Sequence, residues 1–254
     1  MNKKNRDSNH STTEDVPDTD LHIDKLQTSV ALSLMLESQS AAIPALTTAL
    51  PAIEAAVTAA HDRLVANSAG RLIYAGAGTS ARIGVQDGVE LPPTFNWPKK
   101  RLAFLIAGGP SALLDAIENA EDDEKAGVTD ASKIKISKHD VVIGVAASGQ
   151  TPYTHGVILA ARAAGALTIG IANNPDTPLL TAASYPILLE TGGEIIAGST
   201  RLKAGTAQKI CLNLISNMIM VKMGFVANGM MVAMVPTNEK LRRRREQIDL
   251  KLQK

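Results

Sequence analysis

The chain has 254 residues, of which 45% are hydrophobic and 3% aromatic, and its formal net charge is +1. This length is enough for one large domain or two small ones, with a core built mainly from aliphatic side chains. A charge so close to zero gives no electrostatic basis for binding DNA or an anionic membrane, and few aromatic rings are available to stack on bases. We therefore expect neither a nucleic-acid nor a membrane partner.

Residues 1–20 are rich in Asn, Asp, Ser and Thr, so we predict a disordered tail there and a single domain over residues 21–254. The tail contains no apolar run of the kind that marks a signal peptide. Cys211 is the only cysteine and lies within an apolar helical pattern, which predicts a buried thiol in a reducing compartment, here the cytoplasm. The five histidines lack metal-pair spacing, and we expect no metal and no other cofactor.

Helical periodicity comes first along the chain, around Leu26–Leu36 and again over Leu46–Leu64. From residue 71 onward, apolar runs alternate with helical patterns. Strands are predicted at 71–76, 101–107, 140–146, 167–172 and 185–190. This alternation predicts an α/β fold, a three-layer αβα sandwich around a five-stranded parallel, doubly wound sheet with N-terminal helices.

Proline and glycine mark the helix ends between these strands. Thr151-Pro152 and Thr177-Pro178 each combine an N-cap residue with a proline at the first helical position, and Gly165 is placed to end the first of these helices. A long helix is predicted from Leu202 to Met223. The last helix is predicted to begin near Pro236 and to carry Arg242–Arg245 on a solvated surface.

Two predicted strands run directly into similar loops, GAGTS at 76–80 and SGQTP at 148–152. Each loop places small hydroxyl residues and free backbone N–H groups at the start of a helix, an arrangement that suits a phosphate group. Neither loop has the lysine of a P-loop. The GxGxxA spacing of the first is a weak dinucleotide signal, and an alternative is that these glycines only form tight turns. The loops favour one pocket for a phosphorylated small molecule.

Carboxylates and a third polar string lie near these loops. Glu90 ends the helix predicted at 79–90. The negative end of the helix dipole there disfavours a charged carboxylate and so favours the protonated form, which a general acid requires. An acidic run over 118–124 is expected near the end of the helix that follows strand 101–107. The string GSTRLK at 198–203 opens the long helix. For each of these the alternative is an ordinary solvated surface.

Taken together, six strings resemble the N-acetylmuramic acid 6-phosphate etherases, which are sugar isomerase (SIS) domain proteins. They are GAGTSARIG (76–84), ELPPT (90–94), ENAEDD (118–123), AASGQTPY (146–153), GSTRLKAGTAQK (198–209) and TNEKL (237–241). The resemblance spans roughly residues 45–250 and implies one SIS domain with strand order 2-1-3-4-5. It also implies cleavage of the C3 lactyl ether of N-acetylmuramic acid 6-phosphate to N-acetylglucosamine 6-phosphate and D-lactate.

The family's catalytic residues correspond to Glu90, as the acid, and Glu121, as the second catalytic glutamate. A phosphosugar pocket shared between two subunits of a homodimer is also implied. The expected binding residues lie in the two loops and in the third string, and they are Gly78, Thr79, Ser80, Ser148, Gly149, Gln150, Thr151, Ser199, Thr200 and Lys203.

The chain departs from the family pattern in three places. Gln150 replaces an arginine, Thr13-Glu14 is all that is present of an N-terminal T-E-x-x-N string, and the chain ends at Lys254, before the small helical extension of typical members. The missing extension and Gln150 keep open a non-catalytic sugar-phosphate sensor. An aldose–ketose phosphosugar isomerase is a second alternative, because its reaction also starts by removing a proton beside an aldehyde.

Overall fold

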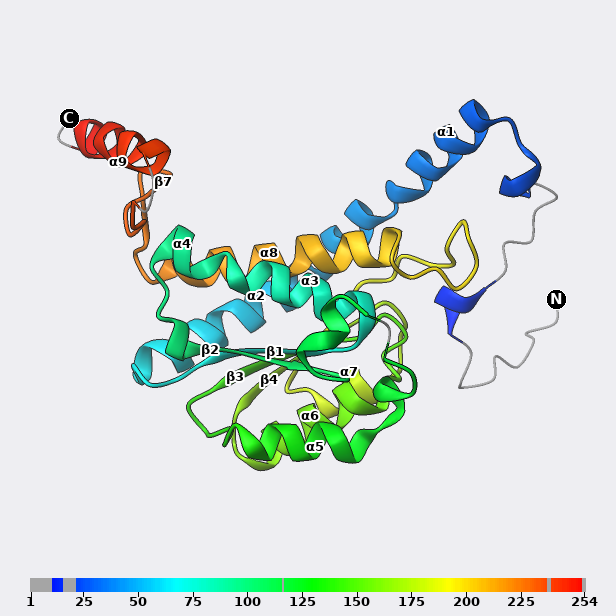
Figure 1. The fold of residues 1–254 in the computed structure, drawn as a ribbon, viewed down its shortest axis with the longest axis horizontal. Helices are drawn as coiled ribbons and strands as arrows, with labels where there is room; N and C mark the ends of the chain where they lie inside the picture. Colours follow the sequence, from blue (N-terminus) through cyan, green and yellow to red (C-terminus); the bar gives the residue numbers. More distant parts are fainter. Residues whose placement is uncertain (1–10, 16–21, 116, 237–238, 253–254) are drawn as a thin grey trace.

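The computed structural model describes residues 11–15, 22–115, 117–236 and 239–252, and its centre is a five-stranded parallel sheet (Figure 1). The strand order is β2-β1-β3-β4-β5, which confirms the order implied by the family resemblance. The strands are β1 (Leu72–Gly76), β2 (Leu102–Ile106), β3 (Val141–Val145), β4 (Leu167–Ala172) and β5 (Tyr185–Leu188). Each predicted strand is therefore present, with small differences at the ends.

Strand residues alternate between two cores, one on each face of the sheet. In β1, Leu72 and Tyr74 belong to one cluster, whereas Ile73 and Ala75 belong to the other. Because both faces are covered, the residues of β1, β3 and β4 are all buried. This explains why these strands read as continuous apolar runs in the sequence.

Helices form a layer on each face of the sheet (Figure 1), which confirms the three-layer αβα sandwich. The longer helices α2 and α8 pack together over one face, with α3 beside α8, and α5, α6 and α7 cover the other. The first group comprises α2 (Ala42–Ala66), α3 (Gly78–Val89) and α8 (Lys203–Lys222), and the second α5 (Glu124–Lys133), α6 (Pro152–Ala163) and α7 (Pro178–Ala182). Cys211 lies buried in the first core, as its apolar setting predicted.

The remaining elements lie outside these layers. They are α1 (Thr28–Gln39), the short α4 (Leu91–Phe95), a hairpin of β6 (Val226–Ala227) and β7 (Met230–Met231), and α9 (Glu239–Leu252). Figure 1 shows α1 and α9 extending away from the sheet at opposite ends of the molecule. The helical stretch Thr28–Ala66 is long and apolar enough to cross a membrane by length and composition alone. Its longer second part, α2, contributes nine buried residues to the fold, as expected of a core helix.

Three segments differ from the sequence predictions. Residues 11–15, placed in a disordered tail, form a 3-10 turn with a buried Thr13, while residues 1–10 and 16–20 lie outside the described residues. The acidic run does not end a helix, because the described residues between β2 and α5 form only short 3-10 turns, and α5 begins at Glu124. The string after Glu90 starts α4 instead of simply stopping α3. Residues 237–238 of the last motif also lie outside the described part of the chain.

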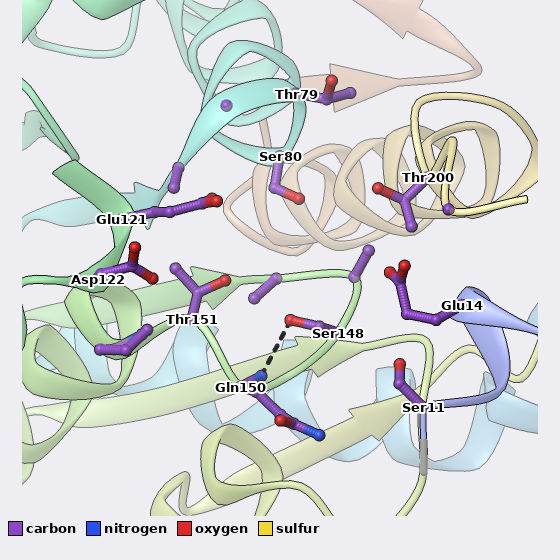
Figure 2. A pocket seen from close by; sticks show the side chains of 16 residues that line it. Ser11, Glu14, Thr79, Ser80, Glu121, Asp122, Ser148, Gln150, Thr151 and Thr200 are labelled. Carbon is purple, nitrogen blue, oxygen red and sulfur yellow. Dashed lines mark hydrogen bonds between the residues drawn. The ribbon is translucent and has the colours of Figure 1, made fainter. Parts of the chain in front are cut away.

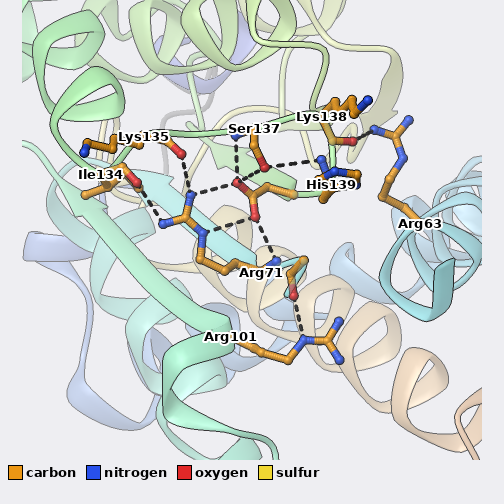
Figure 3. Close-up of polar contacts among 10 residues, drawn as sticks. Arg63, Arg71, Arg101, Ile134, Lys135, Ser137, Lys138 and His139 are labelled. Carbon is orange, nitrogen blue, oxygen red and sulfur yellow. Dashed lines mark hydrogen bonds and ion pairs between the residues drawn. The ribbon is translucent and has the colours of Figure 1, made fainter. Parts of the chain in front are cut away.

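A partly buried ion pair lies at the amino ends of β1 and β3, opposite the predicted loops (Figure 3). The carboxylate of Asp140, just before β3, accepts hydrogen bonds from the backbone N–H of Arg71, at 2.9 Å, and from its guanidinium, at 2.7 and 3.1 Å. It also accepts the backbone N–H of Ser137 at 2.8 Å. This pair ties the starts of β1 and β3 together, which holds their carboxyl ends, and the loops that follow, in register.

Candidate functional site

A cavity of about 750 Å³ lies at the carboxyl ends of β1 and β3 (Figure 2). Its walls come from both predicted loops, from the segment before α8, from the 3-10 turn before α5 and from the N-terminal turn. The lining residues are Ser11, Glu14, Ala77, Gly78, Thr79, Ser80, Glu121, Asp122, Ala146, Ala147, Ser148, Gln150, Thr151, Pro152, Gly198 and Thr200. The structure therefore brings together segments from both ends of the chain.

Two helices begin at this cavity, α3 at Gly78 and α6 at Pro152. Among the described contacts, no side-chain hydrogen bond caps either N-terminus. By contrast, Asp123 caps α5 and Thr177 caps α7. Uncapped helix starts carry unpaired N–H donors and the positive end of the helix dipole. The two starts at the cavity are therefore suited to hold an anion such as a phosphate group.

The two serines of these loops differ in what their hydroxyl groups do. Ser148 Oγ accepts the backbone N–H of Gln150 at 3.1 Å, and its proton has no acceptor among the described contacts. Ser80 Oγ donates to Gln208 Oε1 at 2.9 Å, in a buried chain that continues from Gln208 Nε2 to Asn173 Oδ1 and from Asn173 Nδ2 to the carbonyl oxygen of Leu189. A carbonyl only accepts, so this chain has one direction, and the Ser80 proton is committed to Gln208.

The start of α8 is occupied by a carboxylate of the chain itself. Glu194 is fully buried, and its two oxygens accept the backbone N–H groups of Lys203, at 3.3 Å, and Ala204, at 3.0 Å. This helix start is therefore already satisfied and is not open to a ligand. Of the three residues predicted here, Thr200 lines the cavity, whereas Ser199 and Lys203 are not among its lining residues.

Gly149 is also absent from the cavity wall and has a structural role. Its φ angle is +68°, and a Cβ added there would lie 2.3 Å from Thr177 Oγ1. Its carbonyl accepts the N–H of Leu179 at 3.1 Å. Gly149 therefore shapes the second loop and joins it to α7.

Glu121 lies in the wall between the main cavity and a smaller one of about 440 Å³. It belongs to a 3-10 turn, Ala120–Asp122, directly before the N-cap of α5. Figure 2 shows its carboxylate on the same side of the cavity as Thr151 and Asp122. The structure thus brings one of the two predicted catalytic glutamates to the loops.

Glu90 lies elsewhere. It follows the last residue of α3, whose first three residues line the cavity, and from Ser80 to Glu90 the helix rises by about 15 Å at 1.5 Å per residue. It lines a separate cavity of about 190 Å³ between α3 and α8, together with Asp87, Lys209 and Asn213. Within one chain, the structure does not bring Glu90 and Glu121 into a common site.

A buried polar cluster around Asp87 forms the floor of the cavity that Glu90 lines. Its carboxylate accepts hydrogen bonds from the Tyr74 hydroxyl at 2.7 Å, from Asn213 Nδ2 at 2.6 Å and from Ser216 Oγ at 3.0 Å. Burial and the Asp87 charge raise the pKa of Tyr74 well above its ordinary value. Tyr74 therefore remains a hydrogen-bond donor, and the cluster holds the end of α3 that carries Glu90 against α8.

Relatives with curated names match almost the whole chain. An N-acetylmuramic acid 6-phosphate etherase of Deinococcus radiodurans is 50% identical over 229 residues, which cover 90% of this chain and 74% of the relative. A second, of Streptomyces avermitilis, is 45% identical and covers 89% of this chain and 72% of the relative. The chain belongs to the N-acetylmuramic acid 6-phosphate etherase family.

Domain models and solved structures agree with this etherase family assignment. The glucokinase regulatory protein N-terminal SIS domain matches residues 53–162, and the general SIS domain matches residues 120–218. A phosphoheptose isomerase from Francisella tularensis has a TM-score of 0.57 at 15% identity, covering 76% of this chain and 98% of that one. The Vibrio vulnificus NanR protein complexed with ManNAc-6P has a TM-score of 0.50 at 13% identity, covering 88% of this chain and 71% of that one. At these identities the two structures show a shared fold.

Eight cavity residues of this etherase family member were not among the expected site residues, namely Ser11, Glu14, Ala77, Asp122, Ala146, Ala147, Pro152 and Gly198. Ser11 and Glu14 were missed because they fall in the segment predicted to be disordered, and the incomplete Thr13-Glu14 motif is the sequence signal that points to them. Among the described residues, no group of three or more His, Cys, Asp or Glu side chains is placed to hold a metal ion.

Proposed function

We propose that this protein cleaves the C3 lactyl ether of N-acetylmuramic acid 6-phosphate, giving N-acetylglucosamine 6-phosphate and D-lactate. The observation that carries the proposal is the main cavity, where two uncapped helix starts and the carboxylate of Glu121 face the same space. Membership of the etherase family supplies the substrate and the reaction. A reducing compartment suits the single buried thiol, so the cytoplasm is the proposed location.

The proposed reaction is an elimination followed by addition of water. In the open-chain sugar, the C1 aldehyde makes the C2 proton acidic, so a carboxylate base can remove it. The C3–oxygen bond then breaks while a general acid protonates the departing lactate oxygen, leaving a double bond between C2 and C3. Water adds at C3, and C2 regains a proton. We assign Glu121 as the base, because it lies at the cavity, and Glu90 as the acid.

This assignment requires a second chain, because Glu90 and Glu121 line different cavities of one chain. We propose a homodimer in which Glu90 of one subunit completes the main cavity of the other. Exposed apolar side chains support such contacts. Val89 precedes Glu90 and is 47% exposed, and Leu214, Met218 and Val221 form an exposed stripe along α8. Neighbouring residues of α8 line the Glu90 cavity, so this apolar surface and Glu90 occupy one region.

Incubation with N-acetylmuramic acid 6-phosphate tests the reaction. We expect release of D-lactate, with solvent deuterium at C2 of the product and solvent oxygen-18 in its C3 hydroxyl. Formation of a ketose without lactate would instead indicate an isomerase, and tight binding without turnover would indicate a sensor. Glu90→Gln and Glu121→Gln should each lower turnover by about 100-fold or more, the usual contribution of a positioned acid or base.

Mixing the two inactive variants tests the shared site. Random exchange of subunits makes half of the dimers mixed, and each mixed dimer has one site with both native glutamates. Activity should therefore recover to about a quarter of the wild-type value. No recovery, under conditions where co-purification of differently tagged variants shows that subunits exchange, would place both glutamates in sites formed by a single chain.

A further inference from the structure

The N-terminal turn of residues Ser11–Asp15, here called the strap, forms one wall of the main cavity. Thr13 at its centre is fully buried, although it precedes the first long helix by many residues. Ser11 and Glu14 lie on either side of Thr13 and point into the cavity, close to Ser148 and Thr200 (Figure 2). The strap is therefore part of the site and not a peripheral tail.

Asn174, two residues beyond β4, holds the strap in place. Its Oδ1 accepts the Thr12 hydroxyl at 2.9 Å and the Thr13 backbone N–H at 3.1 Å, while its Nδ2 donates to Thr13 Oγ1 at 2.9 Å. The same Nδ2 donates to the carbonyl of Ala147, in the second phosphate loop, at 3.0 Å. One buried amide thus fixes the strap relative to Ser148.

Two glycines leave room for the strap to approach. A Cβ added at Gly198 would lie 3.0 Å from Glu14 Oε2, and one added at Gly193 would lie 3.2 Å from Asp15 Cβ. The segment before α8 therefore packs directly against the strap. The backbone that carries Glu14 therefore lies between this segment on one side and the Asn174 hydrogen bonds to Thr12 and Thr13 on the other.

The charge of the cavity limits what Glu14 can bind. The side chains that line the cavity include the carboxylates of Glu14, Glu121 and Asp122, and no Lys or Arg is among the described lining residues. Figure 2 shows Glu14 on the opposite side of the cavity from Glu121. A carboxylate only accepts hydrogen bonds, and it repels a second anion. Glu14 therefore suits a neutral donor, a hydroxyl or an amide N–H, and not a phosphate or a carboxylate.

We propose that Glu14 is a specificity-determining residue that accepts a hydrogen bond from a neutral donor of the sugar, at the side of the cavity opposite Glu121. This proposal rests on the proposed function for the identity of the sugar phosphate. Glu14 selects sugars with a hydroxyl or amide N–H at that position. It also sets the orientation of the sugar, because an anionic substituent is repelled from the strap side.

Binding measurements test this role without any turnover. Calorimetry with N-acetylglucosamine 6-phosphate and with inorganic phosphate would be compared for the wild type, Glu14→Ala and Glu14→Gln. The Glu14 side chain is exposed, so neither change disturbs the core. Glu37→Gln, an exposed glutamate on α1, is the matched control.

Glu14→Ala should weaken binding of the sugar phosphate about 10- to 150-fold, the usual range for a hydrogen bond to a charged group, and leave binding of inorganic phosphate unchanged or slightly tighter. Glu14→Gln keeps an acceptor oxygen, so its affinity for the sugar phosphate should lie between those of the wild type and Glu14→Ala. Glu37→Gln should match the wild type. Equal losses for both ligands, or unchanged sugar-phosphate binding in Glu14→Ala, would overturn the proposal. Absence of lactate release by the wild type would instead count against the proposed function.

A double-mutant cycle with the strap anchor gives a second test. Thr13→Val removes the hydroxyl that accepts Asn174 Nδ2 and should weaken sugar-phosphate binding by loosening the strap. In the Glu14→Ala background the same change should have little further effect, because the group positioned by the strap is already gone. Fully additive losses would contradict a role for the strap in presenting Glu14.

Discussion

Ser80 and Ser148 occupy similar places in the two loops, but their hydrogen bonds predict different consequences when each is changed to alanine. The Ser148 hydroxyl proton is free among the described contacts, so it is available to a phosphate oxygen. A hydrogen bond to a charged group contributes about 1.5–3 kcal/mol, so Ser148→Ala should weaken phosphorylated ligands by roughly 10- to 150-fold. The free energy of unfolding of the unliganded protein should hardly change.

The Ser80 hydroxyl already donates to Gln208, which is 1% exposed. Ser80→Ala leaves that buried acceptor without its donor, at a cost of about 1–3 kcal/mol in the free energy of unfolding. For a chain of this size the melting temperature should fall by roughly 2–12 °C. Phosphate affinity should fall by less than in Ser148→Ala, because the backbone N–H groups at the start of α3 remain.

Thermal unfolding without ligand, and calorimetric titration with inorganic phosphate and N-acetylglucosamine 6-phosphate, separate these effects. Both variants are measured at one protein concentration, since a dimer is proposed. The reasoning would be refuted if Ser80→Ala lost phosphate affinity as strongly as Ser148→Ala while keeping the wild-type melting temperature. That result would mean that the Ser80 proton turns from Gln208 to the ligand at little cost.

Three further outcomes follow from contacts away from the cavity. Asp140→Asn should lower the free energy of unfolding by about 3 kcal/mol in urea titrations, because an amide group replaces the carboxylate, on a side chain only 2% exposed, that accepts from Arg71. A loss below about 1 kcal/mol would mean that the pair contributes no more than an exposed one. Burial alone raises the pKa of the Asp140 carboxyl, but the hydrogen bonds from Arg71 outweigh burial and lower the pKa. The stabilisation by Asp140 is therefore present above about pH 4 and is lost as the pH falls further. The difference in free energy of unfolding between Asp140→Asn and the wild type should narrow in that acidic range. Gly127→Ala would place a Cβ 2.2 Å from the Tyr153 carbonyl oxygen and force α5 and α6 apart. The free energy of unfolding should fall by about 1–3 kcal/mol, and kcat/KM should fall as well. Val128→Ala, on the exposed side of α5, should change neither quantity, and equal behaviour of the two variants would contradict the close packing.

Much of the fold was predictable because it depends on local pattern. The strands are apolar runs covered on both faces, and Thr151-Pro152 and Thr177-Pro178 mark the helix starts that the structure has. The chain between β2 and α5 was not predictable in this way. Gly108, Gly109 and Asn119 adopt positive φ angles there, so the backbone makes short turns where a helix was expected.

The candidate site was predictable where it coincides with strand-to-helix loops, and not where it depends on distant contacts. Thr13 and Asn174 are separated by 161 residues in the sequence, and no local composition reveals that they meet. Glu90 was correctly placed at the end of a helix that starts at the loops. Helical periodicity nonetheless carried no information about how far that end lies from Glu121, since a distance of this kind depends on the helix length and on the assembly.

Asn173 and Asn174 are adjacent in sequence at the end of β4, yet their amides reach in different directions. Asn173 accepts from Gln208 in the chain that leads to Ser80, and Asn174 joins the strap to the second loop. The two loops and the strap are therefore parts of one system, linked through these adjacent asparagines. By thermodynamic reciprocity, whatever factor a docked strap adds to ligand affinity, a bound ligand adds to docking of the strap. Release of product and any loosening of the N-terminal turn would then be coupled equilibria, and mutation at either asparagine should change the coupling.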